Sequence, residues 1–405
     1  MGKLINKILG ALSSKRSTVI LSFLGVYLLS SGASWAIFSY VRGEPSLYVS
    51  EEDKRAGIDP NLPKTEECPI NGKLFSEPER DIWESRRPVA VIIENHSDSR
   101  PPSGISRADV VYEAVAEGGI TRFLSIFYCG AAASDVEVAP VRSARVYYID
   151  WAAEYGDQPI FMHVGGANDY SGYGDTTRKA RALELLETIG WRYAGGNDLD
   201  TTYDSGFPVF WRNYERLERT VATEHTMMAS LDAAYKEAKK RGFEAKDSDG
   251  EAWDENFVEW KFGDDSASGA ADATEISFEF WEDTLGSQDY AVVWKYDAGG
   301  NRYLRENGGE KYSDLVSGEQ ISAKNVVIQF TKQLGPVDRN KHILYTTIGK
   351  GSALIFKNGT VTSGTWEKAS QEGRTRFFDE NGSEVSFVRG PIWIEVLAVG
   401  NEVEY

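Results

Sequence analysis

The sequence predicts an α/β domain followed by a mainly β domain, both outside a membrane that is crossed by a single N-terminal helix. Three observations support this fold class. Short apolar runs alternate with helical spacing at residues 86–243, tight-turn signals separate short strands at 276–405, and a long uncharged segment lies near the N-terminus. Strands interspersed with helices are typical of a layered α/β domain, whereas repeated short strands indicate a β domain. The 405 residues suffice for two domains.

The N-terminal segment predicts a membrane anchor. Residues 18–41 include no charged side chain over 24 positions, and about 20 residues suffice to span the hydrocarbon core. Four bases precede this run: Lys3, Lys7, Lys15 and Arg16. The positive-inside rule therefore places residues 1–17 in the cytoplasm and the rest of the chain outside the cell membrane. A cleaved signal peptide is the alternative, because small residues at 31–36 resemble a cleavage site, and it leads to the same location.

Two segments are predicted to connect folded parts. Residues 42–85 hold five prolines and eleven acids against six bases, without periodicity, which is typical of an extracytoplasmic tether. From Glu244 to Asp289 there are fifteen acids and two bases, so residues 244–275 are predicted to form an acidic linker. The domains are then residues 86–243 and residues 276–405.

The predicted elements follow from apolar runs and turn residues. In the first domain we expect strands at 88–94, 109–115, 121–128 and 159–164, and helices at 142–155, 177–189 and 223–241. In the second domain, strands flank Asn358-Gly359 and Asn381-Gly382, which are strong hairpin signals, and further strands are expected at 290–296, 301–305 and 393–397.

Composition and missing motifs exclude several classes of protein. The net charge of −18 argues against nucleic-acid binding, which depends on lysine and arginine. Two cysteines exclude a disulfide-rich scaffold and a cysteine-only zinc site, and they leave a Cys68–Cys129 disulfide undecided. The sequence contains no HExxH, GxxxxGK[ST], GxSxG or SxxK signature.

Charged residues collect at predicted strand ends and helix starts of the first domain. Ligands of open α/β sheets bind at such places, and guanidinium groups there bind carboxylates or phosphates. An internal salt-bridge network is the equally open alternative. The candidate residues are Glu94, Glu113, Arg122, Arg142, Arg145 and Asp150.

Two histidines complete the candidate catalytic set. His163 lies in an apolar strand, and His225 lies near the start of a helix predicted to be capped by Thr223. The dipole at such a helix start would favour a neutral imidazole, which could act as a base or simply pack. Neither histidine has a second His or Cys nearby in the sequence, so spacing indicates no metal site, and a cofactor is likewise undetermined.

Many segments of the chain, in order, resemble the DUF3048 family over residues 86–403. They are RPVAVIIENH at 87–96, RPPSG at 100–104, ADVVYE at 108–113, EGGITRF at 117–123, PVRSAR at 140–145, HVGG at 163–166, EHTM at 224–227, NVVIQ at 325–329, GTW at 364–366 and RTRF at 374–377. The resemblance implies a bacterial, membrane-attached, two-domain envelope protein. It implies no activity, because the family is named for its unknown function. Members often carry a lipid-modified cysteine, whereas no cysteine lies near the apolar segment here.

Two functions remain open from the sequence. The first is a binding or scaffolding protein that takes an anionic wall-related ligand or a partner protein. The alternative is an enzyme acting on a cell-wall glycopolymer or a lipid-linked phosphate precursor, because RAD at 107–109, LSI at 124–126 and PVR at 140–142 are loosely similar to LytR-CpsA-Psr transferases. In that enzyme, the three candidate arginines would hold the anion, a carboxylate would act as acid or base, and a histidine would assist. The lack of a clear nucleophile and base favours the binding protein.

Overall fold

The computed structural model describes residues 58–265, 271–281 and 287–405, together with Tyr27 and Ser30. The predicted cytoplasmic segment 1–17, nearly all of the predicted anchor 18–41 and the first part of the predicted tether lie outside the described residues. In the part of the chain that is described, no helix is both long and apolar enough to cross a membrane. Residues 58–405 form one compact unit.

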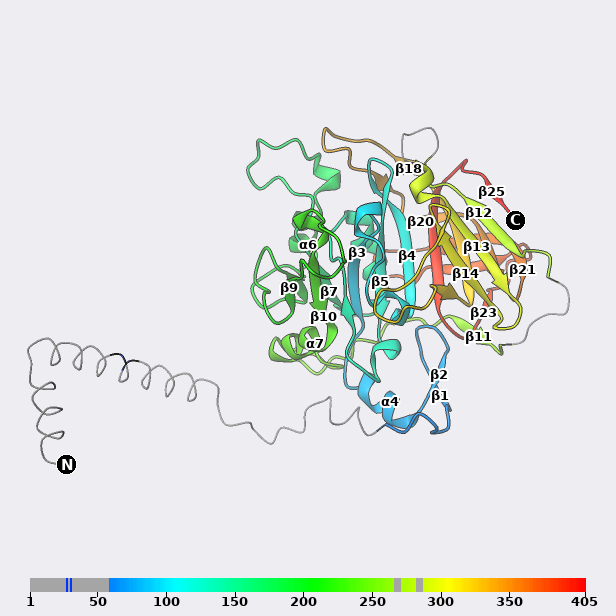
Figure 1. The fold of residues 1–405 in the computed structure, drawn as a ribbon, viewed down its shortest axis with the longest axis horizontal. Helices are drawn as coiled ribbons and strands as arrows, with labels where there is room; N and C mark the ends of the chain where they lie inside the picture. Colours follow the sequence, from blue (N-terminus) through cyan, green and yellow to red (C-terminus); the bar gives the residue numbers. More distant parts are fainter. Residues whose placement is uncertain (1–26, 28–29, 31–57, 266–270, 282–286) are drawn as a thin grey trace, which may run out of the picture. The chain divides into compact units, whose positions relative to one another are not determined.

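A ten-stranded mixed sheet runs through this unit (Figure 1). Its strands, in spatial order, are β22 (Arg376–Asp379), β21 (Thr360–Lys368), β20 (Gly349–Lys357), β17 (Asn325–Thr331), β24 (Ile392–Ala398), β4 (Val110–Glu117), β5 (Ile120–Phe127), β3 (Val89–Glu94), β7 (Ile160–His163) and β8 (Asp198–Asp200). The first five come from the predicted β domain and the last five from the predicted α/β domain. They meet where β24 pairs in parallel with β4, from Ile392 opposite Val110 to Glu395 opposite Glu113.

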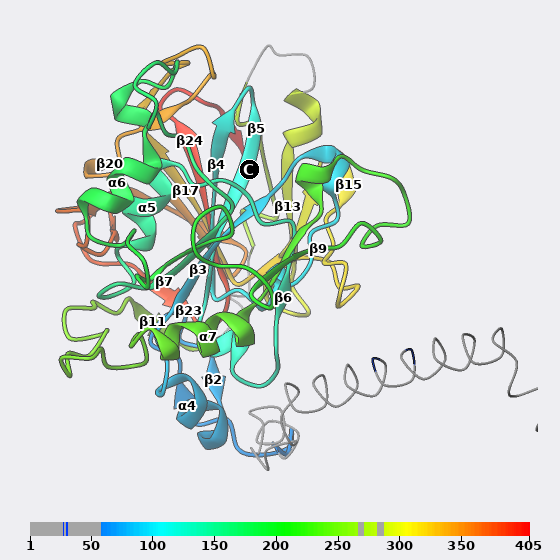
Figure 2. The same ribbon diagram turned by 90° about the vertical axis from the view of Figure 1, so that its left-hand side faces the viewer.

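The rest of the unit covers the two faces of this sheet. Figure 2 shows α5 (Val146–Ala152), α6 (Ala182–Thr188) and α7 (Leu231–Lys240) on the near side. The six-stranded sheet packs on the other side (Figure 1) and comprises β15 (Glu310–Lys311), β14 (Arg302–Asn307), β13 (Val292–Asp297), β12 (Glu275–Phe278), β25 (Val403–Glu404) and β16 (Ser322–Ala323). Because both faces are covered, the central strands are almost continuously apolar.

Short elements complete the fold. The small sheets are β1 (Glu66–Glu67) with β2 (Leu74–Phe75), β6 (Glu137–Val138) with β10 (Met227–Ser230) and β9 (Phe210–Arg212), β11 (Lys261–Gly263) with β23 (Ser386–Val388), and β18 (Gln333–Leu334) with β19 (Leu344–Tyr345). Among the described residues from 58 onward, the remaining α-helix is α4 (Glu77–Trp83), and short 3-10 helices span Ser97–Ser99, Ile105–Arg107, Cys129–Ala131, Arg178–Ala180, Thr223–His225 and Ser287–Tyr290.

Aromatic side chains fill both interfaces of the central sheet. Tyr112 of β4 stacks on Trp151 of α5 with ring centroids 5.5 Å apart. On the opposite face, Trp393 of β24 packs edge-on against Trp294 of β13 at 5.3 Å. Side chains alternate along each strand, so neighbouring residues of β4 and β24 serve the two different interfaces. One sheet thus joins the helices to the second sheet.

Several sequence predictions are confirmed at the level of elements. The first three predicted strands correspond to β3, β4 and β5, and the first predicted helix contains α5. The hairpin between β20 and β21 turns at Asn358-Gly359, where both residues have positive φ. Such values are those of the type I′ turn that the dipeptide favours.

The predicted helix at 223–241 is wrong in its first half. Met227–Ser230 forms strand β10, which pairs with β6 and β9. The helix α7 begins only after Ser230, whose side chain accepts a hydrogen bond from the amide of Ala233. Strand pairing with distant residues thus overrides the local helical pattern, and Thr223 does not cap this helix.

The predicted tether ends earlier than the sequence suggested. Cys68 and Trp83 are buried, and a disulfide joins Cys68 to Cys129 with Cα atoms 6.0 Å apart. A capping box between Ser76 and Glu79 starts helix α4. Residues 58–85 therefore belong to the folded unit, because a covalent bond and buried apolar side chains attach them to it.

The predicted acidic linker also belongs to the folded unit. Trp253 and Trp260 are buried, and β11 pairs in parallel with β23. The two predicted domains keep their different secondary structure, but a shared sheet and a packed connection join them. Residues 86–243 and 276–405 are therefore parts of one packed unit.

A buried ion cluster lies between the two large sheets. Arg305 of β14 is fully buried and places its Nη2 atom 2.5 Å from Glu113 and its Nη1 atom 2.6 Å from Glu395. Trp294 donates an indole hydrogen bond to Glu395 at 2.9 Å. Burial and the charge of Glu113 raise the pKa of Glu395 well above its ordinary value, although the charge of Arg305 opposes this. Glu113, a candidate site residue, is therefore part of the core.

Replacing the central cation should severely destabilise the protein. Arg305→Met leaves two buried carboxyl groups without their cation, so we expect the free energy of unfolding to fall by about 3–5 kcal/mol. Arg302→Met is the matched control, because Arg302 lies on the same strand and pairs with Asp297 at the surface. That change should cost no more than about 1 kcal/mol. Urea unfolding measures both values, and equal losses would contradict a special role for Arg305.

The shared sheet also predicts that the two predicted domains do not fold alone. A fragment of residues 86–243 would expose β4 as a long apolar edge. In residues 276–405, β24 would keep β17 but lose β4, its other partner. We expect neither fragment to show a cooperative thermal transition, whereas the full chain should show one. Cooperative melting of both isolated fragments would overturn this expectation.

Candidate functional site

Five of the predicted site residues converge at one end of the central sheet. Glu94 ends β3 and lies opposite Arg122 of β5 in the strand register. The segment before α5 brings Arg142 beside them, because its amide donates a hydrogen bond to the carbonyl of Ile92 at 2.9 Å. The five residues are Glu94, Arg122, Arg142, Arg145 and His225.

Glu117 neutralises two of these arginines. It lies at the end of β4, and both Arg122 and Arg145 pair with its carboxylate. The Nη2 atom of Arg145 lies 2.8 Å from each carboxylate oxygen. Burial alone would raise the pKa of Glu117, but the charges of the two arginines and the hydrogen bonds of Arg145 lower it to about 2. Glu117 was not among the predicted site residues, although it borders the same turn as Arg122.

Glu94 joins the other members of the group. One carboxylate oxygen lies 3.0 Å from Nε of Arg142, and the other lies 2.8 Å from Nδ1 of His225. His225 belongs to the 3-10 helix Thr223–His225, and its ring packs against the ring of His96 with centroids 4.9 Å apart. Burial, followed by the charge of His225, lowers the pKa of His96. Sequence reasoning missed His96, because residues 96 and 225 are far apart in the chain.

Three other predicted site residues lie elsewhere. Glu113 belongs to the core cluster with Arg305. Asp150 accepts hydrogen bonds from Thr347 at 2.6 Å and Gln371 at 2.8 Å, and burial raises its pKa. His163 is fully buried with its Nε2 atom 2.6 Å from Asp198. Burial would lower the pKa of this histidine, but the charge and hydrogen bond of Asp198 raise it.

Two adjoining cavities open at the opposite end of the strands, near the start of β4. Their volumes are about 560 and 450 Å³, and five residues line both: Lys73, Leu74, Ser106, Glu319 and Pro391. Cavities of this size accommodate small ligands or segments of polymers. Residues from the predicted tether, from the loop before β4 and from the β-rich part all contribute to their walls.

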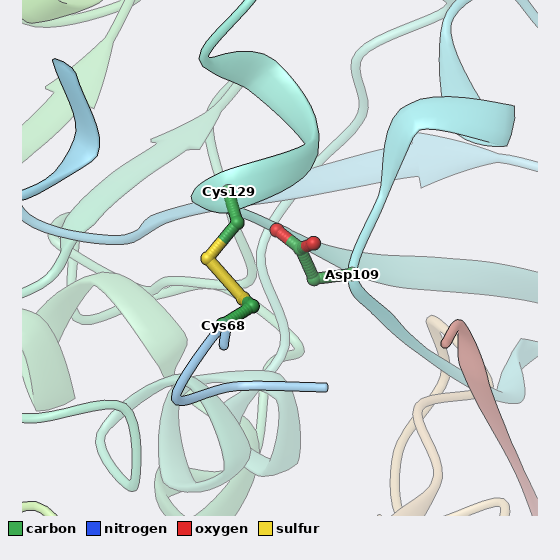
Figure 3. A group of neighbouring side chains, drawn as sticks. All are labelled: Cys68, Asp109 and Cys129. Atoms are coloured by element: carbon green, nitrogen blue, oxygen red, sulfur yellow. A yellow bond between two sulfur atoms is a disulfide. The ribbon is translucent and has the colours of Figure 1, made fainter. Parts of the chain in front are cut away.

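The Cys68–Cys129 disulfide and the carboxylate of Asp109 lie side by side in this region (Figure 3). Asp109 accepts hydrogen bonds from the amides of Tyr128 at 2.7 Å and Gly130 at 3.1 Å, and from the side chain of Asn71 at 2.8 Å. Burial raises the pKa of Asp109 to about 6, although these amides oppose the shift. Cys68 and Cys129 approach Asp109 as a metal site would require, but their sulfur atoms are bonded to each other and are not free ligands.

Two cations at these cavities lack a carboxylate partner among the described residues. No acidic side chain in that part of the chain forms an ion pair with Lys73 or Arg107. Lys73 lies 5.2 Å from the ring centre of Phe75, and Nε of Arg107 donates to the carbonyl of Gly130 at 3.1 Å. The other basic residues of the lining do form ion pairs: Lys64 with Glu79, Lys324 with Asp265, Arg302 with Asp297 and Arg389 with Glu67 and Asp264.

Comparisons with known proteins agree with the fold. The description "Protein of unknown function (DUF3048) N-terminal domain" matches residues 75–244, and the corresponding C-terminal domain matches residues 283–394. The chain is 28% identical over 353 residues to "Putative lipoprotein YerB" of Bacillus subtilis (strain 168). The aligned residues cover 87% of this chain and 91% of that protein. The crystal structure of YerB from Bacillus subtilis is similar with a TM-score of 0.64 and 23% identity, over 84% of this chain and 100% of the solved chain.

The salt bridges of Glu117 predict a specific dependence of stability on pH. A carboxylate with a lowered pKa contributes stability that is complete above its unfolded value near 4.5 and is lost as the pH falls toward about 2. Glu117→Gln should remove this part of the dependence. It should also lower the free energy of unfolding at pH 7 by about 3–5 kcal/mol, because two buried arginines lose their carboxylate.

Urea unfolding at pH 7, 5 and 3 measures this effect. Glu310→Gln is the control, because Glu310 is exposed on β15 and forms no ion pair with a described residue. The control should keep the stability and pH dependence of the wild type. If the Glu117→Gln variant lost stability between pH 5 and 3 as steeply as the wild type, the ionic role of Glu117 would be wrong.

Proposed function

The chain belongs to the DUF3048 family, and we propose that it is a membrane-attached envelope protein that binds an anionic, wall-related ligand. The ligand would bind in the two adjoining cavities near the start of β4. The observation that carries this proposal is the pair of cations at the cavity walls, Lys73 and Arg107, which have no carboxylate partner among the described residues. The function is binding rather than catalysis.

Three features support a location outside the cytoplasm. The uncharged segment 18–41 follows four bases, as in a membrane anchor with a cytoplasmic N-terminus. The Cys68–Cys129 disulfide is of a kind that persists in oxidising compartments. The similar protein of Bacillus subtilis carries the name "Putative lipoprotein YerB". We therefore propose that residues 58–405 lie on the outer side of the cell membrane.

Electrostatics favour a local rather than a long-range recognition of anions. The net charge of −18 repels an anion at a distance, so binding requires cations that are close to the ligand and not already neutralised. Lys73 and Arg107 meet this requirement. Arginine can bind a phosphate or carboxylate in a bidentate manner, and lysine adds a compact charge beside it.

The disulfide and Asp109 would preorganise this binding site. Cys68 lies five residues before Lys73, and the carbonyl of Lys73 accepts a hydrogen bond from the amide of Cys68 at 3.0 Å. Gly130 follows Cys129 directly. Its carbonyl accepts a hydrogen bond from Arg107, and its amide donates one to Asp109. The segment that carries Lys73 and the 3-10 helix that ends at Arg107 are thereby linked to each other. Such preorganisation reduces the entropy lost on binding.

The arginines chosen from the sequence support this proposal less well. Arg122 and Arg145 share Glu117, and Arg142 pairs with Glu94. This is the internal network that the sequence left open as an alternative. We therefore place the ligand beside Lys73 and Arg107.

The enzyme alternative receives no support from the positions of its three sequence strings. Arg107 and Asp109 precede the first residue of β4, which lies opposite Ile126 of β5. Arg142 lies beside Glu94, which is opposite Arg122 at the other end of β5. The residues thus lie at opposite ends of the same strands and do not form one site.

A binding titration tests the proposal. We expect the full chain in detergent to bind purified, phosphate-containing wall polymer, with an affinity that falls as salt increases. Lys73→Met and Arg107→Gln should each weaken binding about tenfold or more while leaving the melting temperature nearly unchanged. Lys236→Met is the control, because Lys236 is exposed on α7, away from the cavities, and should bind like the wild type.

Two results would oppose the proposal. Absence of binding by the wild type to wall polymers and to inorganic phosphate would remove its basis. Equal weakening by all three variants would indicate a nonspecific charge effect instead of a site.

A further inference from the structure

We propose that His96, Asp98 and His225 form a binding site for a divalent transition-metal ion, with Zn²⁺ as the expected ion. Imidazole nitrogens with a carboxylate oxygen are a ligand set that suits this ion. The site is separate from the cavities beside Lys73 and does not depend on the proposed function.

The three side chains already approach the required geometry. One ligand atom from each of them lies within 4.8 Å of the other two. Two atoms bound to the same Zn²⁺ at about 2.1 Å lie at most about 4.2 Å apart. The side chain of Asp98 is 69% exposed, so it can rotate to supply the remaining approach.

Glu94 prepares His225 to be a ligand. One carboxylate oxygen of Glu94 lies 2.8 Å from Nδ1 of His225, and the other lies 3.0 Å from Nε of Arg142. Because Nδ1 contacts this carboxylate, Nε2 is the ring nitrogen of His225 that is available to bind a metal ion. Carboxylate, histidine and metal in this order are the common arrangement of protein metal sites, in which the carboxylate fixes the ring orientation.

Among the described residues, three histidines form a hydrogen bond with a carboxylate, and only one of them, His225, has a second histidine beside it. His163 and His342 also contact carboxylates, at 2.6 Å from Asp198 and 2.8 Å from Asp338. Both ring nitrogens of His163 are occupied, since the second lies 2.7 Å from the carbonyl of Gly165. In His96 the Nδ1 atom accepts a hydrogen bond from the amide of Asp98 at 3.1 Å, so Nε2 is the nitrogen that would bind the ion. Within the part of the chain that the structure describes, one group of three potential metal ligands contains histidine, and it consists of His96, Asp98 and His225.

The location would leave room for a further ligand. After β3, His96 directly precedes the 3-10 helix Ser97–Ser99, and Asp98 lies within this helix. The side chain of His96 is 28% exposed. Three protein ligands with solvent access leave a fourth position for water or for an incoming group, as in open zinc sites. The positive charge of Arg142 is neutralised by Glu94, so it does not prevent a cation from binding nearby.

Calorimetry of the full chain with Zn²⁺ tests the site. After treatment with a chelator, the wild type should bind one ion per chain, and Co²⁺ should give visible absorption bands of a coordinated ion. His96→Gln and Asp98→Asn should each weaken Zn²⁺ binding at least tenfold. Both residues are partly or largely exposed, so these variants should fold.

Two further variants distinguish this site from binding elsewhere on the chain. His342→Gln removes a histidine of the same His–carboxylate type that lies outside the group, so it should leave Zn²⁺ affinity unchanged. Glu94→Gln should weaken binding by about 10–100-fold, because Glu94 is a positioning residue that orients His225. A thermal melt without metal shows whether this variant is folded.

The proposal fails if the wild type binds no Zn²⁺ or Co²⁺ at millimolar concentration. It also fails if His96→Gln binds Zn²⁺ as tightly as the wild type, because binding would then occur elsewhere. Loss of wall-polymer binding by Lys73→Met has no bearing on this result, so the two sites can fail separately.

Discussion

The contact of Arg305 with Glu113 and Glu395 is the constraint on which the two large sheets depend. Glu113 and Glu395 are register partners on β4 and β24, where the two halves of the sequence meet in one sheet. Arg305 reaches them from the second sheet. A buried charge without its partner costs several kcal/mol, so this cluster disfavours any other register of β24 on β4. It therefore couples the pairing within one sheet to the packing of the other.

The same constraint on buried charge determines which residues are available for function. Arg122 and Arg145 are held by Glu117, so their positive charge is neutralised within the fold. Lys73 and Arg107, in contrast, lie near the carboxylate of Asp109, which already accepts hydrogen bonds from backbone amides. Residues that stand out in a sequence because they are charged and near strands thus divide into two groups. The proposed ligand would bind to the second group, whose members have no carboxylate partner among the described residues.

Sequence reasoning identified one end of the sheet correctly and misjudged its chemistry. Strand ends can be located from apolar runs, so the convergence of Glu94, Arg122 and Arg142 was predictable. Their neutralisation by Glu117 and Glu94 depends on rotamers and on strand register, which short patterns do not specify. His96 was missed because its partner, His225, follows 129 residues later and reaches it through the pairing of β10. Lys73 was missed because the proline-rich segment around it lacks periodicity.

The sequence by itself determined what local physics controls. Apolar runs specify buried strands such as β3 and β4, Asn358-Gly359 specifies a hairpin, and similarity across many segments specifies the family. Only the tertiary structure decided the parallel pairing of β24 with β4, the Cys68–Cys129 disulfide and the partner of each buried charge. Local features depend on backbone geometry and periodicity within a few residues. Pairing between distant segments depends on packing of the whole unit, because each such contact is stable only when the others have formed.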